Sequence, residues 1–253
     1  MKRLSKKVWK TGIIIFSIIG VCFQCNRIPD NPPVFQYPGF DTQCIFIEDF
    51  DGIDPQWKIE GAGTTQVSPD SGLIIAPFTD SLGVIIWLDK DFENSYQVEY
   101  QLNFNDTLGM HLLYAGTAGL HDENALNIEK LQPGAYESYS EANLKNYQIS
   151  MHCYDLKGEH HAHSRLRKNP GNILLSHIPE DPCRENRQYT IDFIKTGNRL
   201  QLFVDGKRYH DFRDKGDRKS LYNKGKIGFW FSGKPGHFTA NIMNIRVYAL
   251  VPN

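Results

Sequence analysis

Cysteine is scarce in this sequence of 253 residues, and its spacing excludes a common kind of metal site. Only five cysteines are present, and Cys22 and Cys25 lie at the end of an N-terminal apolar run. The other three, Cys44, Cys153 and Cys183, form no CxxC pair, so we do not expect a zinc site built from thiolates. In an oxidising compartment one pair of these three could form a disulfide and leave one thiol free.

No apolar run is long enough to cross a bilayer comfortably. The longest extends from about Gly12 to Phe23, after a segment in which five of the first ten residues are Lys or Arg. This pattern is typical of a signal peptide. A cysteine at its end indicates lipoprotein processing, in which that cysteine is acylated and becomes the mature N-terminus. We favour Cys25 over Cys22, because the polar residues Asn26 and Arg27 follow Cys25.

The chain is therefore expected to have three parts. Residues 1–25 are predicted to be a lipoprotein signal peptide, which places the protein in a bacterial cell envelope, lipid-anchored in the periplasm or on the outer-membrane surface, or secreted. Residues 26–42 contain four prolines and no hydrophobic periodicity, which is typical of an extended tether. Residues 43–253 fit a single domain.

The sequence also lacks an excess of charge of either sign. It has 28 basic and 29 acidic residues, a formal net charge of −1. No global field therefore favours nucleic acid as a partner. Contact with a membrane is expected only through the N-terminal lipid.

Helical periodicity is almost absent from residues 43–253. Short strand-like stretches separated by turn residues predict an all-β sandwich or barrel. Asp205-Gly206 lies between two alternating stretches and predicts a tight hairpin. One short helix or irregular insert is expected between Asp122 and Leu131. The expected strands are Cys44–Glu48, Gln56–Glu60, Gly72–Ala76, Gly83–Leu88, Tyr96–Phe104, His111–Ala115, Asn146–Tyr154, His161–Arg167, Tyr189–Lys195, Arg199–Val204, Lys207–Phe212, Lys226–Phe231 and His237–Leu250.

Two polar rows stand out between Gly134 and Gly171. Successive side chains of a strand point to opposite faces, so alternation separates a polar face from an apolar one. Amides, hydroxyls, imidazoles and guanidiniums turned the same way could hold a hydroxyl-rich or carboxylate-bearing ligand. The alternative, a solvated outer face of an ordinary antiparallel sheet, stays open. The first row is Asn146, Gln148, Ser150, His152 and Tyr154, opposite Ile149 and Met151, and the second is His161, His163, Arg165 and Arg167.

Other strands carry further polar candidates. Glu99 shares a face with Gln97, Gln101 and Asn103, and His111 alternates with apolar neighbours. If these strands belong to one sheet, Trp230 would add an aromatic platform for the apolar face of a pyranose. For Trp230 the alternative is core packing, and for Glu99 it is a solvated position.

Element order and local motifs resemble a known fold family. The order of strands and hairpins resembles the concanavalin A-like jelly roll, with the last strand returning beside the first. The motifs Tyr136-x-x-Tyr139, Gln148-Ile149-Ser150, Arg165-x-Arg167-Lys168-Asn169-Pro170-Gly171 and Gly225-Lys226-Ile227-Gly228-Phe229 are similar to the YesU-like family, domain of unknown function 1961. The resemblance implies two antiparallel sheets, a sugar site on the concave face, and a context of polysaccharide breakdown in bacterial polysaccharide-utilisation loci. It implies no catalytic residue.

The candidate residues fit one kind of carbohydrate-active enzyme better than another. A retaining glycosidase needs paired carboxyls, and the Glu-x-Asp-x-(x)-Glu strand motif of jelly-roll hydrolases is absent. A polysaccharide lyase needs a group that neutralises a uronate carboxylate, plus an acid and a base. We assign these roles to Arg165, Tyr139 and His152. The expected substrate-binding residues are Tyr136, Asn146, Gln148, Ser150, His163, Arg167, Glu99, His111 and Trp230.

A non-catalytic interpretation fits the same residues. Binding faces and lyase faces use the same residue types, so the sequence leaves open a surface lipoprotein that binds polysaccharide or oligosaccharide without reacting. A purely structural module is the third alternative, in which the polar rows are ordinary surface.

A histidine-rich run and two aspartates carry side chains of the kinds that bind metal ions. His161 and His163 could chelate from one strand face, but a run such as Glu159-His160-His161-Ala162-His163 is more typical of an exposed turn. We therefore assign no cofactor and no metal ligand. A structural calcium ion near Asp49 and Asp51 is a further expectation.

Overall fold

The computed structural model describes residues 37–52, 56–130, 132–141, 143–184 and 187–253. The predicted signal peptide, with Cys22 and Cys25, and residues 26–36 of the predicted tether lie outside the described residues. Within the described ranges, no helix combines the length and apolarity that a membrane span requires.

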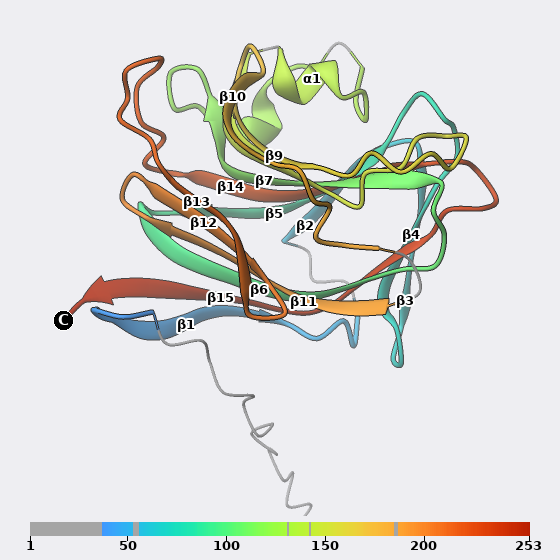
Figure 1. The fold of residues 1–253 in the computed structure, drawn as a ribbon, viewed down its shortest axis with the longest axis horizontal. Coiled ribbons are helices and arrows are strands. Elements are labelled where there is room, and N and C mark those ends of the chain that lie inside the picture. Colours follow the sequence, from blue (N-terminus) through green and yellow to red (C-terminus); the bar gives the residue numbers. More distant parts are fainter. Residues whose placement is uncertain (1–36, 53–55, 131, 142, 185–186) are drawn as a thin grey trace, which may run out of the picture. The chain divides into compact units, whose positions relative to one another are not determined.

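The described chain forms two layers of antiparallel β-sheet (Figure 1). This confirms the all-β, two-sheet prediction, and β1 does pair with β15, the last strand. The eight-stranded sheet has the order β13 (Lys207–Arg213), β12 (Arg199–Val204), β11 (Arg187–Thr196), β6 (Ser95–Phe104), β15 (Ala240–Pro252), β4 (Gly72–Pro77) and β3 (Gly63–Ser68), with β1 (Phe40–Glu48) on β15. The seven-stranded sheet has the order β10 (Ile173–Ile178), β9 (Ser164–Asn169), β8 (Leu144–Met151), β7 (Gly109–Gly119), β14 (Gly225–Gly233), β5 (Val84–Phe92) and β2 (Trp57–Gly61).

Two strands, β3 and β10, were missed from the sequence. Both are edge strands in which no residue is buried, so the apolar face that marks a half-buried strand is weak in each of them. The predicted hairpin at Asp205-Gly206 is confirmed. Asp205 (φ 50°) and Gly206 (φ 74°) both have positive φ, as the two central residues of a type I′ turn require.

The main core lies between the two sheets and is built from alternate residues of each strand. On β8 the inward residues are Tyr147, Ile149 and Met151, so Ile149 and Met151 face the core as predicted. They pack with apolar and aromatic residues of both layers, including Tyr100 and Phe229. The intervening residues of β8 are left for the outer face of the seven-stranded sheet.

A second apolar cluster lies on that outer face, beneath the insert of residues 120–143. The insert contains the 3-10 helix η1 (Ala125–Asn127) and the short helix α1 (Glu137–Ser140), which Figure 1 shows above the seven-stranded sheet. The sequence prediction of a short helix near 122–131 is met by η1, whereas α1 was not predicted. The cluster comprises Ile85, Trp87, Leu112, Tyr114, Ala125, Tyr139, Leu144 and Trp230.

A buried ion pair fixes β9 to the interior. The Lys168 ammonium lies 2.5 Å from Asp214 Oδ2, and the two side chains are 0% and 3% exposed. Lys168 Nζ also donates to the carbonyl of Lys219 at 2.7 Å, and the Tyr147 hydroxyl donates to Asp214 Oδ2 at 2.7 Å. Lys168 therefore points inward while its neighbour Arg167 points to the outer face.

Candidate functional site

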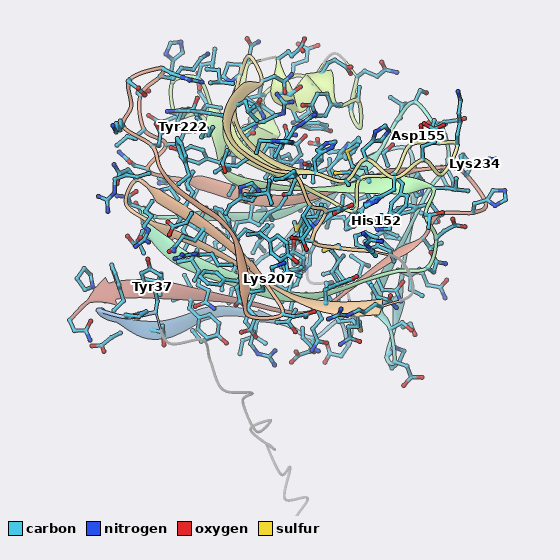
Figure 2. All side chains as sticks on the ribbon, in the orientation of Figure 1. Tyr37, His152, Asp155, Lys207, Tyr222 and Lys234 are labelled. Atoms are coloured by element: carbon cyan, nitrogen blue, oxygen red, sulfur yellow. The ribbon has the colours of Figure 1, made fainter. Side chains whose placement is uncertain are left out.

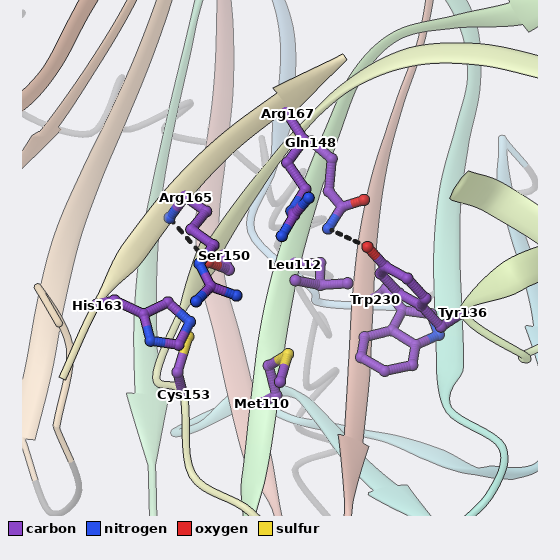
Figure 3. Close-up of a pocket in the computed structure, with 10 residues that line it drawn as sticks. All are labelled: Met110, Leu112, Tyr136, Gln148, Ser150, Cys153, His163, Arg165, Arg167 and Trp230. Atoms are coloured by element: carbon purple, nitrogen blue, oxygen red, sulfur yellow. Dashed lines mark hydrogen bonds between the residues drawn. The ribbon is translucent and has the colours of Figure 1, made fainter. Parts of the chain in front are cut away.

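A cleft of about 280 Å³ opens on the outer face of the seven-stranded sheet, beside the insert (Figure 3). Its residues come from β7, β8, β9 and β14, with Tyr136 from the insert and two residues, Cys153 and His163, from the connection between β8 and β9. The lining residues are Met110, Leu112, Tyr136, Gln148, Ser150, Cys153, His163, Arg165, Arg167 and Trp230.

Strand alternation and register bring the polar residues of the cleft together. Gln148 on β8 is the register partner of Arg167 on β9, and both side chains point outward into the cleft. The next pair along the strands, Ile149 and Leu166, points inward to the core. The backbone N–H of Arg165 donates to Ser150 Oγ at 3.0 Å. This bond links Ser150 and Arg165, the next outward-pointing residues of the two strands. The two strands thus present amide, hydroxyl and guanidinium groups on one face.

Two guanidiniums enter the cleft without a carboxylate to neutralise them. Arg167 Nη1 donates to the carbonyl of Asn172 at 2.7 Å, and its charge has no acidic partner among the described residues. In the same ranges, no ion pair or side-chain hydrogen bond engages the Arg165 guanidinium, and no Asp or Glu lines the cleft. The arrangement leaves the fork-shaped donors of Arg165 available to an anionic group.

A chain of hydrogen bonds holds the upper part of the cleft. Asn169 Nδ2 donates to Gln148 Oε1 at 3.0 Å, which orients the Gln148 amide, and Gln148 Nε2 lies 3.4 Å from the Tyr136 hydroxyl. That hydroxyl donates to Asn172 Oδ1 at 2.5 Å. Asn172 therefore fixes both Tyr136, through its side chain, and Arg167, through its carbonyl.

The opposite side of the cleft is apolar and aromatic. Trp230 is 5% exposed, and its Nε1 donates to the carbonyl of Gly134 at 2.9 Å. The Tyr136 ring meets it edge-on, with ring centroids 6.4 Å apart, and Met110 and Leu112 lie beside the pair (Figure 3). A saccharide ring with one apolar face could lie against this surface while its polar groups meet β8 and β9.

His163 is a neutral imidazole at neutral pH. Desolvation, followed by the charges of Arg165 and the neighbouring groups His161, His177 and Arg167, lowers the pKa of His163 to about 4. The His163 ring lies 6.2 Å from that of His161 and 6.1 Å from that of His177. Its free ring nitrogen can therefore accept a proton or a hydrogen bond inside the cleft.

Comparison with protein families places the chain. The family described as domain of unknown function (DUF1961) matches residues 44–243. The chain belongs to this family. No curated protein matches the sequence. The DUF1961 assignment agrees with the resemblance drawn from the sequence, whereas the narrower YesU-like label and the polysaccharide-utilisation context stay predictions.

Solved structures show the fold of this DUF1961 chain. A Bacillus subtilis protein of unknown function with a galectin-like fold is similar at 20% identity and TM-score 0.74, over 85% of this chain and 100% of that chain. A kappa-carrageenase from Pseudoalteromonas carrageenovora, in complex with an oligotetrasaccharide of kappa-carrageenan, has 11% identity and TM-score 0.57 over 87% and 100%. The Crh5 transglycosylase has 12% identity and TM-score 0.55 over 83% and 85%. The fold is a jelly-roll β-sandwich.

The prediction that His152 faces the groove is wrong. His152 is 0% exposed and lies between the layers, stacked on Phe104 at a centroid distance of 3.8 Å (Figure 2). Its Nε2 donates to the carbonyl of Asp106 at 2.9 Å. The cause is its left-handed backbone, with φ 53°, which breaks the alternation after Met151 and turns Cys153 to the cleft instead.

Tyr139 and Asn146 lie under the insert rather than in the cleft. The Tyr139 hydroxyl donates to Glu60 Oε2 at 3.1 Å and accepts from the Gly134 N–H at 2.8 Å, and its side chain is fully buried. Burial and then the charge of Glu60 raise the pKa of Tyr139 well above its usual value. Asn146, also fully buried, donates to the carbonyl of Tyr139. The predicted acid–base role of Tyr139 has no access to a ligand in this arrangement.

Glu99 and His111 are also misplaced by the sequence prediction. Glu99 belongs to β6 of the eight-stranded sheet, where its register partners are Asp192 and Arg246, so the assumption of one sheet fails. His111 points into the core, with Nδ1 donating to the carbonyl of Trp230 at 3.1 Å. Burial lowers the pKa of His111 to about 3.

Met110, Leu112 and Cys153 line the cleft but were not among the residues predicted from the sequence. Met110 and Leu112 alternate with the inward His111, so both faces of β7 carry apolar residues. The nearly continuous apolar run of β7 is the sequence signal that could have indicated this. Cys153 comes two residues after the inward Met151, so regular alternation would turn it inward as well, and it reaches the cleft only because the backbone turns at His152. Burial raises the pKa of Cys153 to about 12, so its thiol is neutral.

The described residues contain no group of three or more His, Cys, Asp or Glu side chains arranged to hold a metal ion. In the histidine-rich run, His161 Nε2 lies 3.7 Å from Asp155 Oδ2, and His160 Nε2 lies 3.1 Å from the buried Asp181. The calcium expectation stays a prediction, and Asp49 Oδ1 lies 3.6 Å from Arg246 Nη2.

Proposed function

We propose that the cleft binds a saccharide bearing a carboxylate, as in a uronic-acid-containing polysaccharide. The observation that carries this proposal is the pair of guanidiniums of Arg165 and Arg167, which face the cleft with no acidic side chain to neutralise them. A guanidinium fork matches a carboxylate in planar, bidentate geometry. The aromatic and apolar side of Trp230 and Tyr136 supports a sugar as the body of the ligand.

Two structures of similar fold, each solved with a bound oligosaccharide, also support a carbohydrate ligand. The kappa-carrageenase was solved with an oligosaccharide, and the VIP36 luminal domain, similar at TM-score 0.53 and 14% identity, was solved with Ca²⁺ and Man3GlcNAc. In our proposal this chain serves polysaccharide capture at a bacterial cell envelope, held by a lipid on Cys25 or Cys22. Cells that express the protein are given a labelled fatty acid, and each of the two cysteines is replaced in turn. The cysteine whose replacement abolishes labelling of the protein is the acylated one.

The binding test compares oligosaccharides of equal length by isothermal calorimetry. We expect a uronic-acid oligomer to bind at least about tenfold more tightly than its neutral counterpart, a difference of about 1.4 kcal/mol. The preference should shrink with added salt, because it depends on charge. Equal affinity for the charged and neutral oligomers would contradict the proposal.

A lyase reaction is the second candidate, favoured by the neutral imidazole of His163 in the cleft. With His152 and Tyr139 buried, His163 is the remaining base and the Tyr136 hydroxyl the remaining acid, while Arg165 would neutralise the uronate carboxylate. The reaction would appear as the ultraviolet absorbance of an unsaturated uronate. If product forms, His163→Gln should abolish it and leave affinity nearly unchanged. Binding without any product supports the non-catalytic function.

Replacing Asn172 with glycine tests how the cleft is held. Asn172 has φ 52°, a conformation that glycine adopts freely, so the β9–β10 turn should persist while the acceptor for the Tyr136 hydroxyl is lost. We expect a several-fold loss of affinity, about 0.5–1.5 kcal/mol, with little change in melting temperature. Asn244→Gly is the matched control, since Asn244 also has φ 52° and lies on β15 of the other sheet. An equal effect of both variants on affinity would reject the role of Asn172.

A further inference from the structure

The cleft runs across the strands of the seven-stranded sheet, and the insert closes one of its ends. The cleft crosses β9, β8, β7 and β14 in the order of the seven-stranded sheet, and β5 is the next strand. The outward residues Ile85 and Trp87 of β5 are 0% exposed, because they pack under the insert in the cluster with Ala125 and Tyr139. A ligand lying across the strands therefore meets a wall after Trp230.

The wall rests directly on the backbone beneath it. Gly134 has φ 90°, and a Cβ on it would lie 2.4 Å from the carbonyl oxygen of Gly83 and 2.7 Å from Cα of Gly61. The Gly83 N–H donates to the Gly134 carbonyl at 2.9 Å, and the same carbonyl accepts from Trp230 Nε1. Three glycines thus let main chain touch main chain, which leaves no passage for a sugar under Gly134.

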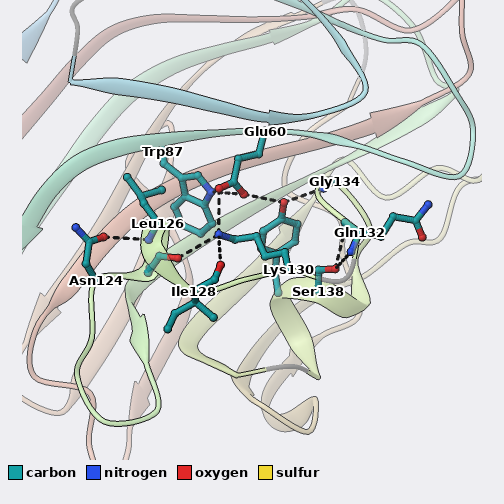
Figure 4. Close-up of polar contacts among 11 residues, drawn as sticks. Glu60, Trp87, Asn124, Leu126, Ile128, Lys130, Gln132, Gly134 and Ser138 are labelled. Carbon is teal, nitrogen blue, oxygen red and sulfur yellow. Dashed lines mark hydrogen bonds and ion pairs between the residues drawn. The ribbon is translucent and has the colours of Figure 1, made fainter.

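An ion pair and several hydrogen bonds hold the wall in place (Figure 4). Lys130 Nζ, in a side chain only 4% exposed, lies 3.0 Å from Glu60 Oε1 on β2 and donates to the carbonyls of Ala125 and Ile128. Glu60 Oε2 accepts from Tyr139 and, at 3.3 Å, from Trp87 Nε1. These contacts anchor Lys130 and Tyr139 of the insert to Glu60 at the edge of the sheet.

A second wall joins the insert to the β9–β10 turn. The Gly171 N–H donates to the carbonyl of Ser140 at 2.9 Å, and Asn172 bonds both Tyr136 and, at 3.2 Å, Glu141. These contacts close the cleft along the strands on the side of α1. The cleft has two closed sides and a volume of about 280 Å³, which is just below the range of ligand pockets that begins at about 300 Å³.

We propose that the cleft takes the end of a glycan chain, a terminal anionic sugar whose acidic group meets Arg165 and Arg167, rather than an internal stretch of the chain. This inference rests on the proposed function, since it specifies which part of the acidic saccharide is bound. An internal segment has to leave the site at both ends. The wall at Gly134 removes the exit across the sheet past Trp230, and the wall at Asn172 removes the exit along the strands on the side of α1, so both exits from the aromatic end of the cleft are closed. The open side, beside His163, is where the rest of the chain leaves.

The experiment measures how many protein molecules bind one chain. The purified protein is titrated by calorimetry with oligogalacturonates of increasing length and defined ends, and with neutral oligomers of the same lengths as controls. We expect one protein per chain at every length, with an affinity per chain that does not rise with length. Reducing the terminal aldehyde sugar, or using chains with an unsaturated non-reducing end, should weaken binding at least about tenfold for one of the two ends.

The outcomes separate this inference from the function on which it rests. A stoichiometry that grows with chain length, together with indifference to both end modifications, overturns end recognition and leaves acidic-glycan binding intact. Binding of no oligogalacturonate at all counts against both proposals. One protein per chain with sensitivity at one end supports both and identifies the end that enters the cleft.

Discussion

Replacing Arg165 with lysine is expected to weaken binding of a uronic-acid oligosaccharide about tenfold or more and to leave the fold intact. Lysine keeps the positive charge but cannot reproduce the planar, two-pronged contact of a guanidinium with a carboxylate. A loss with charge conserved therefore measures geometry rather than net electrostatics. Stability should not change, because no hydrogen bond or ion pair engages the Arg165 side chain in the described part of the chain.

The matched control for this prediction is Arg213→Lys. Arg213 lies exposed at the end of β13 in the eight-stranded sheet, away from the cleft, so the same chemical change there should leave affinity unaltered. Calorimetry gives the affinities, and thermal unfolding of each variant checks that the fold is retained. Equal affinity of wild type and Arg165→Lys would reject the carboxylate contact. A drop of the same size in Arg213→Lys would point to a non-specific charge effect.

Alternation along a strand was enough to predict the polar side of the cleft. Gln148 and Ser150 on β8, and Arg165 and Arg167 on β9, all line it, because a period of two carries over directly into which face a side chain occupies. The same rule failed at His152, since a single residue at φ 53° reverses the alternation at the end of that stretch, so that Cys153 rather than His152 reaches the cleft. Nothing in the residue type marks that shift in advance.

The residues that close the cleft depend on contacts between distant parts of the sequence. Tyr139 is a candidate acid–base group by its sequence position alone, but its hydroxyl donates a hydrogen bond to Glu60, which is 79 positions away in the sequence. Glu99 reads as a cleft residue until its strand is assigned to the other sheet. Sheet membership and long-range pairing are fixed by tertiary packing, which a local pattern does not encode.

Replacing Lys168 with methionine is expected to destabilise the protein by about 3–5 kcal/mol. The change removes the cation from a buried pair and leaves the Asp214 carboxylate, 3% exposed, with only neutral donors such as the Tyr147 hydroxyl. Urea unfolding at neutral pH measures the loss. Lys207→Met is the matched control, because Lys207 pairs with Glu180 at 2.9 Å on the surface, with both side chains more than half exposed, and such pairs contribute about 0–1 kcal/mol.

The pH dependence of unfolding distinguishes the loss of the ion pair from a simple loss of packing, because only the loss of the ion pair makes the stability deficit of Lys168→Met depend on pH. Burial alone would raise the pKa of Asp214, but the hydrogen bonds from Lys168, the Gly216 N–H and Tyr147 outweigh it and hold that pKa below its usual value. The pair therefore stabilises the wild type above the unfolded carboxyl pKa of about 3.9, and this contribution is lost as the pH falls through the lower, folded value. Without Lys168 the buried carboxyl should have a raised pKa, so the stability deficit of Lys168→Met should shrink as the pH is lowered toward 4. A deficit that stays constant between neutral pH and pH 4 would contradict an ionic origin.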